Sequence, residues 1–408
     1  MLKGRARSRA AGTGVSMAKA HKPGALLRER VEHQHARVSY VELFFDLVFV
    51  FAITQISHTL LEHFSPLGVA QAAFLLGAVW WIWIYTSWVT NWLDPERPPV
   101  RILLFVLMFL GLVMSCALPE AFGANGLAFA GAYVTAQLVR SIFTMVSLKD
   151  ASPANYRNFQ RITIWLTCSG LFWIAGGLSE GPLRFGFWLV ALGIEYVGPA
   201  AGFRVPGLGH SRTSDWNVEG GHLSERCALF IIIALGESVL MTGATAAKLP
   251  VTAVNLTAFL NAFLSSVAMW WIYFHIGAER ASHHIARSDD PGRIARIAYT
   301  YLHVLLVAGI ILVAVGDELV IAHPTGHTDG RTAIAVLAGP AFYLLGNLLF
   351  KRITAGWYPF SHLVGLGLLA VLTPVWTVLP PLGFSLAATA ILILVAAWEA
   401  VSLRAKEA

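Results

Sequence analysis

Long apolar runs separated by short polar segments recur from residue 40 to the C-terminus. A helix needs about 20 apolar residues to span the hydrocarbon core of a bilayer. Runs of this length cover residues 40–61, 67–89, 100–118, 124–147, 159–178, 183–203, 224–246, 252–275, 297–317, 332–350, 358–377 and 382–402. Proline and glycine lie in the connections, as in Asp94-Pro95 and Gly181-Pro182, where they end one helix before the next begins. The pattern predicts an all-α integral membrane protein with about 12 transmembrane helices.

Lysine and arginine flank these runs unevenly, and the bias predicts the orientation. With the N-terminus inside, 25 of the 29 Lys and Arg residues fall in inner segments. The outer loops hold only Arg184, Lys248 and Arg331, and Arg140 lies within a run. Cytoplasmic loops of membrane proteins carry an excess of Lys and Arg. An even number of helices then puts both termini in the cytoplasm.

The composition agrees with a membrane protein and argues against other classes. Of the 408 residues, 56% are hydrophobic and 13% are charged, whereas a soluble domain carries about 25% charged residues. The net charge of +6 would suit nucleic acid, but nine basic residues precede Ser39 and most others lie in short loops. We therefore expect the lipid bilayer, and not nucleic acid, as a partner. Cys116, Cys168 and Cys227 lack metal-ligand spacing, and no cofactor motif is present, so we expect no metal and no cofactor.

Two weakly similar halves follow a basic tail. Residues 1–38 lack the apolar core of a secretory signal and predict a disordered cytoplasmic tail, within which Met17 could be the true start. In the rest of the chain, Glu42-Leu-Phe-Phe-Asp-Leu-Val-Phe-Val-Phe-Ala aligns with Glu225-Arg-Cys-Ala-Leu-Phe-Ile-Ile-Ile-Ala-Leu, and Val79-Trp-Trp-Ile-Trp aligns with Met269-Trp-Trp-Ile-Tyr. The predicted segments are a first half at 39–203, a cytoplasmic linker at 204–223, a second half at 224–403 and a tail at 404–408. Six helices in each half imply a parallel 6+6 repeat, related by a pseudo-two-fold axis along the membrane normal.

Polar residues inside the first run are the first candidates for function. Glu42 and Asp46 are four residues apart and therefore share one face of a helix. Ionisable groups inside a bilayer are costly, so they face protein or water and often mark function. Arg140 enters the membrane to a depth close to that of Asp46, and we expect the two to pair. The alternatives are a structural end cap for Glu42 and a substrate anion as the partner of Arg140.

Carboxylates and histidines in later runs extend this set. Glu195 and Glu237 each lie about twelve residues into a run, counted from opposite ends, and could share a proton or a cation. The alternative for both is a structural hydrogen bond to a neighbouring helix. His222, His275 and His303 could relay protons, since imidazole titrates near neutral pH, or they could serve as hydrogen-bonding groups in the packing.

Two long motifs resemble those of a known family. Val41-Glu-Leu-Phe-Phe-Asp-Leu-Val-Phe-Val-Phe-Ala-Ile-Thr-Gln55 resembles the opening signature of the bacterial low temperature requirement protein A (LtrA) family. Glu225-Arg226 with Leu235-Gly-Glu-Ser-Val-Leu240, followed by Trp270-Trp-Ile-Tyr-Phe274, resembles the second-half signature of that family. The resemblance implies a multi-pass protein of the bacterial cytoplasmic membrane. It makes motif residues of Glu42, Asp46, Glu225, Arg226 and Glu237 but gives them no chemical role.

The leading hypothesis is a secondary transporter, in its stronger form proton-coupled, for a small molecule or ion that the sequence does not identify. The candidate pathway residues are Glu42, Asp46, Arg140, Glu195, Glu225, Arg226, Glu237, His222, His275 and His303. The alternative is an integral-membrane enzyme that acts on lipid or another apolar substrate at a cytoplasmic-side acid and histidine site. A third reading is a sensor or scaffold, and a homo-oligomer is compatible with the sequence. A cavity between the halves favours transport, whereas a lateral opening lined by acids and histidines favours the enzyme.

Overall fold

The computed structural model describes residues 26–28, 37–212, 218–275 and 290–407. Within these ranges the chain forms twelve long helices and no strand. The helices are α1 (Tyr40–Glu62), α2 (Pro66–Trp92), α3 (Pro98–Ala117), α4 (Gly126–Leu148), α5 (Pro153–Leu178), α6 (Gly181–Ala200), α7 (Gly220–Ala246), α8 (Ala253–Phe274), α11 (His303–Ala322), α12 (Gly330–Ala355), α13 (Phe360–Leu372) and α14 (Pro381–Glu407). Short α10 (Pro291–Ala295) and the π-helical segment η3 (Arg296–Leu302) lead directly into α11. The expected all-helical fold is confirmed, and each of the twelve apolar runs has its helix.

Eleven of the described helices are long and apolar enough to cross a membrane. The exception is α6, which carries Arg184 and Glu195 within 20 residues. Both side chains are buried against neighbouring helices. The lower hydropathy of α6 therefore reflects charges that face protein, where they can be paired, and not lipid.

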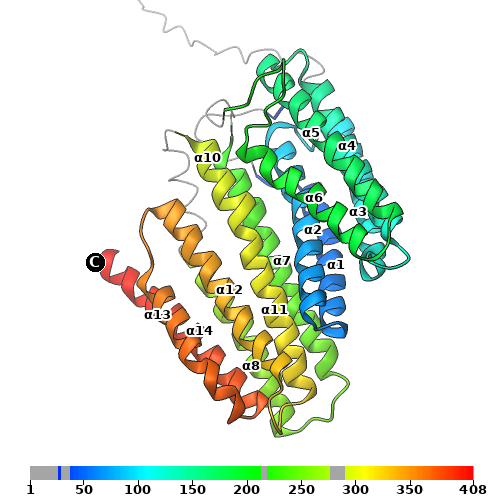
Figure 1. The fold of residues 1–408 in the computed structure, drawn as a ribbon. Coiled ribbons are helices and arrows are strands. Elements are labelled where there is room, and N and C mark those ends of the chain that lie inside the picture. Colours follow the sequence, from blue (N-terminus) through cyan, green and yellow to red (C-terminus); the bar gives the residue numbers. More distant parts are fainter. Residues whose placement is uncertain (1–25, 29–36, 213–217, 276–289, 408) are drawn as a thin grey trace, which may run out of the picture.

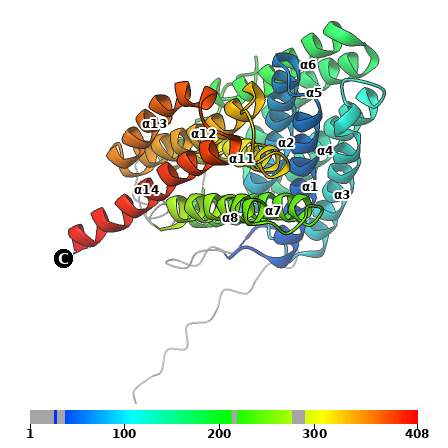
Figure 2. The same ribbon diagram turned by 90° about the horizontal axis from the view of Figure 1, so that it is seen from below.

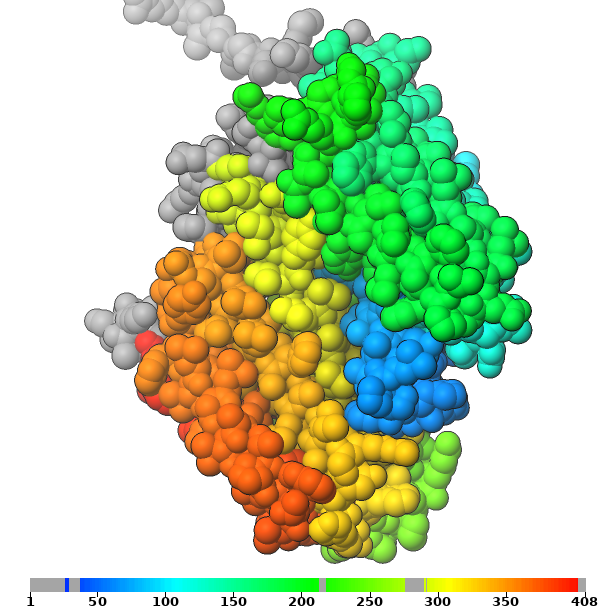
Figure 3. Space-filling model, viewed as in Figure 1, coloured from blue at the N-terminus to red at the C-terminus, as the bar shows by residue number. Residues whose placement is uncertain are grey.

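The helices form two flanks around a central group (Figure 1). Helices α3, α4, α5 and α6 pack in succession on one flank, and α8, α12, α13 and α14 form the other. Between them lie α1, α2, α7 and α11, which contact one another. In the space-filling view, the blue segment of α1 and α2 lies between green α6 and yellow-orange α11 and α12 (Figure 3). Seen from below, α14 extends its C-terminal end beyond the other helices (Figure 2).

Helix α2 is buried on nearly all sides because it occupies the centre. Trp80, Trp81 and Trp83 are each at most 1% exposed. The indole N–H of Trp80 donates to the carbonyl oxygen of Thr300 at 2.7 Å, and that of Trp88 donates to the hydroxyl of Thr300 at 2.9 Å. These bonds tie α2 to the π-helical segment, whose backbone pattern differs from that of the α-helix on each side.

Residues from the predicted tail take part in the fold. The backbone N–H of Arg28 donates to the carbonyl of Trp92, and Asp94 N–H donates to the carbonyl of Leu26. These bonds hold residues 26–28 at the end of α2. Residues 26–28 of the segment predicted as a disordered tail therefore bond to the end of α2, and most of that segment lies outside the described residues. We call this end of the bundle, where α1 and α7 begin, the proximal end, and the opposite end the distal end.

Polar side chains cap several helices. Ser65 accepts a bond from Gly68 N–H, and Thr252 accepts one from Asn255 N–H. Asp329 caps α12 by accepting the Thr332 N–H at 2.8 Å, and hydrogen bonding to Thr332 holds the pKa of Asp329 below its ordinary value. Such caps satisfy backbone N–H groups that have no partner within the helix.

Helices α11 and α12 approach closely because glycine lies at their contact. A Cβ atom at Gly309 would lie 2.7 Å from the backbone nitrogen of Tyr343, and one at Gly339 would lie 2.7 Å from that of Val313. Small residues allow such backbone contact between membrane helices. The close contact also brings the carboxylate-bearing end of α11 against the first turns of α12, since Gly316 faces Ala335 and Val336.

Gly309→Ala should therefore lower the free energy of unfolding by about 1–3 kcal/mol, because the added methyl group overpacks backbone that cannot move away cheaply. Thermal unfolding of the detergent-solubilised protein measures the loss. Gly236→Ala in α7 is the matched control, since a Cβ atom there meets no described atom within 4 Å. Equal destabilisation by the two changes would contradict the close contact.

Candidate functional site

Glu42 joins three segments at the proximal end. It lies in the first turn of α1, where its Oε2 accepts bonds from the backbone N–H and the hydroxyl of Ser39, each at 2.9 Å. Arg28 Nη2 donates to the same oxygen at 2.9 Å. The other oxygen, Oε1, lies 2.9 Å from Nε2 of His222 on α7. Because Glu42 and His222 are both fully buried, the predicted end cap is also a link between the two halves of the chain.

The start of α7 is fixed by a second set of bonds. Glu219 caps the helix by accepting the N–H groups of Gly221 and His222. The side-chain amide of Asn91 on α2 donates to the carbonyl of Glu219 at 2.7 Å and accepts its N–H at 3.0 Å. The ends of α2 and α7 are therefore held in register, and the His222 ring is held facing Glu42.

Asp46 and Arg226 form a fully buried ion pair one helical turn deeper. Arg226 Nη2 lies 2.8 Å from Asp46 Oδ1, and both side chains are 0% exposed. The indole N–H of Trp83 donates to the same carboxylate oxygen at 2.7 Å, and Arg226 also reaches the hydroxyl of Ser87 at 3.3 Å. The guanidinium lies over the rings of Phe45 and Trp83. The pair thus joins α1, α2 and α7.

The predicted pairing of Asp46 with Arg140 is wrong. Arg140 instead lies between α4 and α2, where it donates to the carbonyl of Ile82 at 3.2 Å and to Gln137. It also lies over the ring of Tyr85. Helix α1 packs on α2, α3, α7 and α11 but makes no comparable contact with α4. Asp46 and Arg140 lie at similar depths, but their helices are not neighbours and the two side chains do not pair.

Glu195 is held by four donors within the first half. Tyr133 and Gln137 donate to Oε2 at 2.6 and 2.7 Å, and Ser169 and Trp173 donate to Oε1 at 2.8 and 2.9 Å. The structure does not bring Glu195 and Glu237 together, because both oxygens of Glu195 already have these partners. The arrangement fits the structural alternative, a hydrogen-bonded carboxylate that joins α4, α5 and α6.

The remaining sequence candidates lie apart from the ion pair. His303 is buried and pairs with the Tyr273 hydroxyl at 2.9 Å and the Ala298 carbonyl at 2.8 Å. His275 is exposed and stacks on Trp271. Glu225 is exposed and accepts the backbone N–H of Val38 at 3.3 Å. Among the described residues, the contacts of these three are with other groups and not with the remaining candidates.

Glu237 lines an open cavity at the distal end, which we call the distal cavity. Its volume is about 320 Å³. The lining residues come from α1, from α7 with the following turn, and from α11: Thr54, His58, Glu237, Leu240, Met241, Ala244, Thr245, Lys248 and Glu318. Glu237 is nine residues from Ala246, the last residue of α7, which corresponds to about 14 Å along the helix axis. The cavity therefore brings four ionisable side chains together, three of them on helices and Lys248 in the turn after α7.

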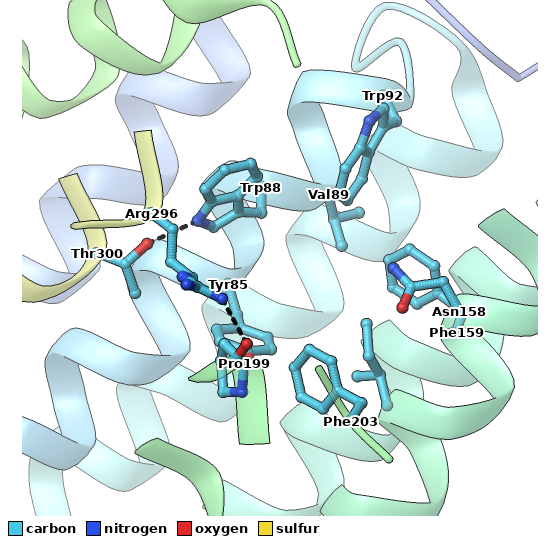
Figure 4. Close-up of a pocket in the computed structure, with 11 residues that line it drawn as sticks. Tyr85, Trp88, Val89, Trp92, Asn158, Phe159, Pro199, Phe203, Arg296 and Thr300 are labelled. Carbon is cyan, nitrogen blue, oxygen red and sulfur yellow. Dashed lines mark hydrogen bonds between the residues drawn. The ribbon is translucent and has the colours of Figure 1, made fainter. Parts of the chain in front are cut away.

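A smaller apolar cavity lies at the proximal end, which we call the proximal cavity (Figure 4). Its volume is about 40 Å³. It is lined by Tyr85, Trp88, Val89, Trp92, Asn158, Phe159, Ile162, Pro199, Phe203, Arg296 and Thr300. Arg296 of η3 donates to the carbonyl of Pro199 at 2.5 Å and so bridges α6 and η3 across the cavity wall. Both cavities therefore lie between helices of the first half and helices of the second.

The second half contains a buried charge cluster whose residues are not among the candidates predicted from the sequence. Lys351 of α12 donates to both carboxylate oxygens of Glu399 on α14 at 2.8 Å and to the carbonyl of Ile272 at 3.2 Å. His362 Nδ1 lies 3.4 Å from Glu399. Glu399 sits inside the apolar run 382–402, a signal of the same kind as the one that singled out Glu195. Lys351 directly follows the run 332–350, a position that predicts an inner loop.

Asp46→Ala should lower the free energy of unfolding by about 3–5 kcal/mol, because it leaves the Arg226 charge buried without its counter-ion. Chemical or thermal unfolding in detergent measures the loss. Glu225→Ala, beside Arg226 in sequence but exposed, is the control and should change stability by no more than about 0.5 kcal/mol.

The double variant Asp46→Leu with Arg226→Met tests the pair directly. Removing both charges should recover most of the loss, because an apolar pair avoids the desolvation cost that a lone charge incurs. Strictly additive losses in the double variant would contradict a direct interaction.

Comparison with known proteins agrees with this architecture. Residues 37–397 match the family model described as bacterial low temperature requirement A protein (LtrA). The chain is also 44% identical over 371 residues to the uncharacterized protein RA0937 of Rhizobium meliloti (strain 1021), an alignment that covers 90% of each chain. No solved structure matches. The chain belongs to the bacterial low temperature requirement A family.

Proposed function

We propose that the protein is a secondary transporter that moves a small polar or cationic solute through the interface between its two halves. The distal cavity is the observation that carries this proposal. One wall belongs to α1 and the others to α7 and α11, and the lining includes His58, Glu237, Lys248 and Glu318. Charged side chains within the span of membrane helices face protein or water. We therefore infer that the distal cavity is filled with water.

The size and charge of the distal cavity limit what it binds. A volume of about 320 Å³ lies at the lower end of the range for small-molecule sites. Glu237 and Glu318 supply two carboxylates against the single ammonium group of Lys248. The excess of carboxylates over ammonium groups favours a solute that carries positive charge, such as an amine, an amino acid or an inorganic cation.

An internal duplication supports the transporter proposal. Arg140 of α4 donates to the carbonyl of Ile82, and Lys351 of α12 donates to the carbonyl of Ile272. Ile82 and Ile272 hold the same position in the two aligned Trp-Trp-Ile motifs. Each basic residue also belongs to a cluster with a glutamate of the last helix in its half. Lys351 contacts Glu399 directly, and Arg140 reaches Glu195 through Gln137.

The order of helix contacts repeats as well. Helices α1, α3, α4, α5 and α6 pack in sequence, and so do α7, α11, α12, α13 and α14. Helix α2 contacts α1 and α6, and α8 contacts α7 and α14. We infer a parallel 6+6 repeat of segments 39–203 and 224–403, a plan in which transporters bind solute between the halves.

In the proposed transport cycle, the solute would reach the interior alternately through the distal cavity and through the proximal cavity. A buried layer lies between them, formed by the Asp46–Arg226 pair and the packed rings of Trp80, Trp83 and Phe230. The Arg28–Glu42–His222 contacts close the proximal end. Rocking of one half against the other would open this end and narrow the distal cavity. Glu237 is the candidate proton carrier, since it lies deepest along α7 among the cavity residues.

The geometry gives less support to an enzyme site on the proximal side. A lipid-processing enzyme would need Glu42, Asp46 and His222 to line an opening that a lipid can enter. All three are fully buried and bonded to neighbouring helices, and none lines either the distal or the proximal cavity. Their contacts are those of structural residues that hold the proximal end of the bundle closed.

Glu237→Gln should abolish solute-driven proton flux in liposomes loaded with a pH-sensitive dye, because the amide cannot carry the proton. The assay compares purified variants while amines, amino acids and inorganic cations are added outside under an imposed proton gradient. Glu120→Gln, at an exposed distal position outside the cavity, is the control and should retain the flux. If Glu237→Gln retained the proton flux of the wild type, Glu237 would not lie on the proton pathway. Solute uptake without proton movement in the wild type would exclude the coupled form.

We further propose that both termini are cytoplasmic and that the distal cavity opens to the outside of a bacterial cytoplasmic membrane. The uneven distribution of Lys and Arg supports this orientation. In a variant without Cys116, Cys168 and Cys227, a membrane-impermeant maleimide added to intact cells should label Thr325→Cys in a distal loop. It should not label Asp150→Cys in a proximal loop until the cells are opened. The reverse pattern would invert the orientation.

A further inference from the structure

A small chamber, separate from the two cavities described above, lies among four helices of the second half. Its volume is about 10 Å³, room for about one water-sized species. The lining comes from α8, α11, α12 and α14: Ser265, Val313, Gly316, Asp317, Val336, Pro340, Ser385, Ala388 and Thr389. The glycine contacts between α11 and α12 make the chamber narrow, since a Cβ atom at Gly316 would lie 3.2 Å from the backbone nitrogen of Val336.

Asp317 is the only acidic residue in this lining. Its side chain is 5% exposed, and its Oδ2 has no hydrogen-bond donor among the described residues. No described basic side chain forms an ion pair with it. A buried, unpaired carboxylate is costly. Either a proton on the carboxyl group or a cation in the chamber balances it.

The other groups that face the chamber are neutral oxygens. Ser265, Ser385 and Thr389 supply three hydroxyl groups. The amide of Asn261 donates to Ser385 Oγ at 2.8 Å, which holds that hydroxyl in place. Pro340 has no N–H, so the carbonyl of Val336, one turn earlier on α12, loses its usual helical partner. Free helix carbonyls of this kind bind Na⁺ in transporters built from interrupted helices.

The donor set selects a class of ion. Oxygen-only donors suit hard cations, whereas zinc and copper sites use nitrogen or sulfur ligands. Ca²⁺ takes six to eight oxygens, commonly with several carboxylates, and Mg²⁺ retains several of its waters. One carboxylate and space for one water-sized species suit neither of these ions. Within the described ranges, no group of three or more His, Cys, Asp or Glu residues could hold a metal, which is consistent with a monovalent ion.

We propose that this chamber is a Na⁺ site, in which Asp317 supplies the charge and Ser265, Ser385, Thr389 and the Val336 carbonyl complete the oxygen shell. Asp317 is followed directly by Glu318, which lines the distal cavity. Ion binding would thus fix the part of α11 that also forms the wall of the distal cavity. The ion site itself requires no transported solute, so it can be tested whether or not the transport proposal holds.

The test measures thermal unfolding of the full-length protein in detergent, together with binding of radioactive ²²Na⁺. NaCl is titrated against N-methyl-D-glucamine chloride at constant ionic strength, with KCl as a second probe. Na⁺ should raise the unfolding temperature of the wild type in a saturable manner, and K⁺ should act more weakly because of the small chamber. Asp317→Asn should fold, since it removes the unbalanced charge, and should lose both the Na⁺ response and ²²Na⁺ binding.

Two further variants keep the test decisive. Thr389→Val keeps the shape of the side chain but removes one oxygen, and should weaken Na⁺ binding by roughly 10–100-fold, the range seen when a supporting contact of a metal site is removed. Glu120→Gln removes an exposed carboxylate outside the chamber and outside both cavities, and should keep the Na⁺ response. A wild type that does not respond to Na⁺ would overturn the proposal in favour of a protonated Asp317. Full Na⁺ binding by Asp317→Asn would locate the ion elsewhere.

Discussion

The requirement that no charge remain unpaired inside a bilayer determines how these helices are arranged. An ionised side chain inside a membrane helix costs several kcal/mol unless protein or water compensates it. The chain meets this requirement by pairing across helices: Asp46 with Arg226, Glu42 with His222 and Arg28, and Glu399 with Lys351. Removing one member leaves the other uncompensated. Each pair therefore selects which helices can be neighbours. The first two pairs lie between α1 and α7, so the contact between the halves depends on them.

The number of helices and their type could be predicted from the sequence, because spanning a bilayer imposes a length that is visible as apolar runs. The apolar runs do not predict which neighbouring helix a given side chain faces. Arg140 and Asp46 lie at similar depths, yet α4 and α1 are separated by the helices between them, and the expected pair does not form. Arg226 and Lys351 lie near the ends of apolar runs, where the sequence predicts inner-loop charges, yet both side chains are buried between helices. Counting Lys and Arg residues near helix ends does not distinguish a side chain that reaches water from one that is buried between helices.

The same limit explains which site residues could be found. Glu42, Asp46, Glu195 and Glu237 were identifiable because a carboxylate interrupts an apolar run. Their roles depend on neighbours that only the fold supplies. Glu195 meets four donors and is fully bonded, whereas Glu237 faces an open cavity with His58, Lys248 and Glu318. Two carboxylates with the same sequence signal therefore differ in chemistry, because one is enclosed within a single half and the other lies between the halves.

The two halves share a contact pattern but not an environment. Trp80 and Trp81 are almost fully buried, whereas their aligned counterparts Trp270 and Trp271 are 44% and 40% exposed. The first-half copy of this helix is enclosed by the bundle, and the second-half copy lies at its edge. Under the proposed duplication, two equal copies would begin with the same environment, so the burial of α2 and the exposure of α8 would represent divergence after duplication.

The burial of α2 also bears on the proposed movement between the halves. The central helix α2 is bonded to η3 through Trp80 and Trp88, and η3 continues into α11, which carries Asp317 and Glu318. The movement that the transporter proposal requires would therefore act on these bonds, which join α2 to the π-helical segment at the start of α11.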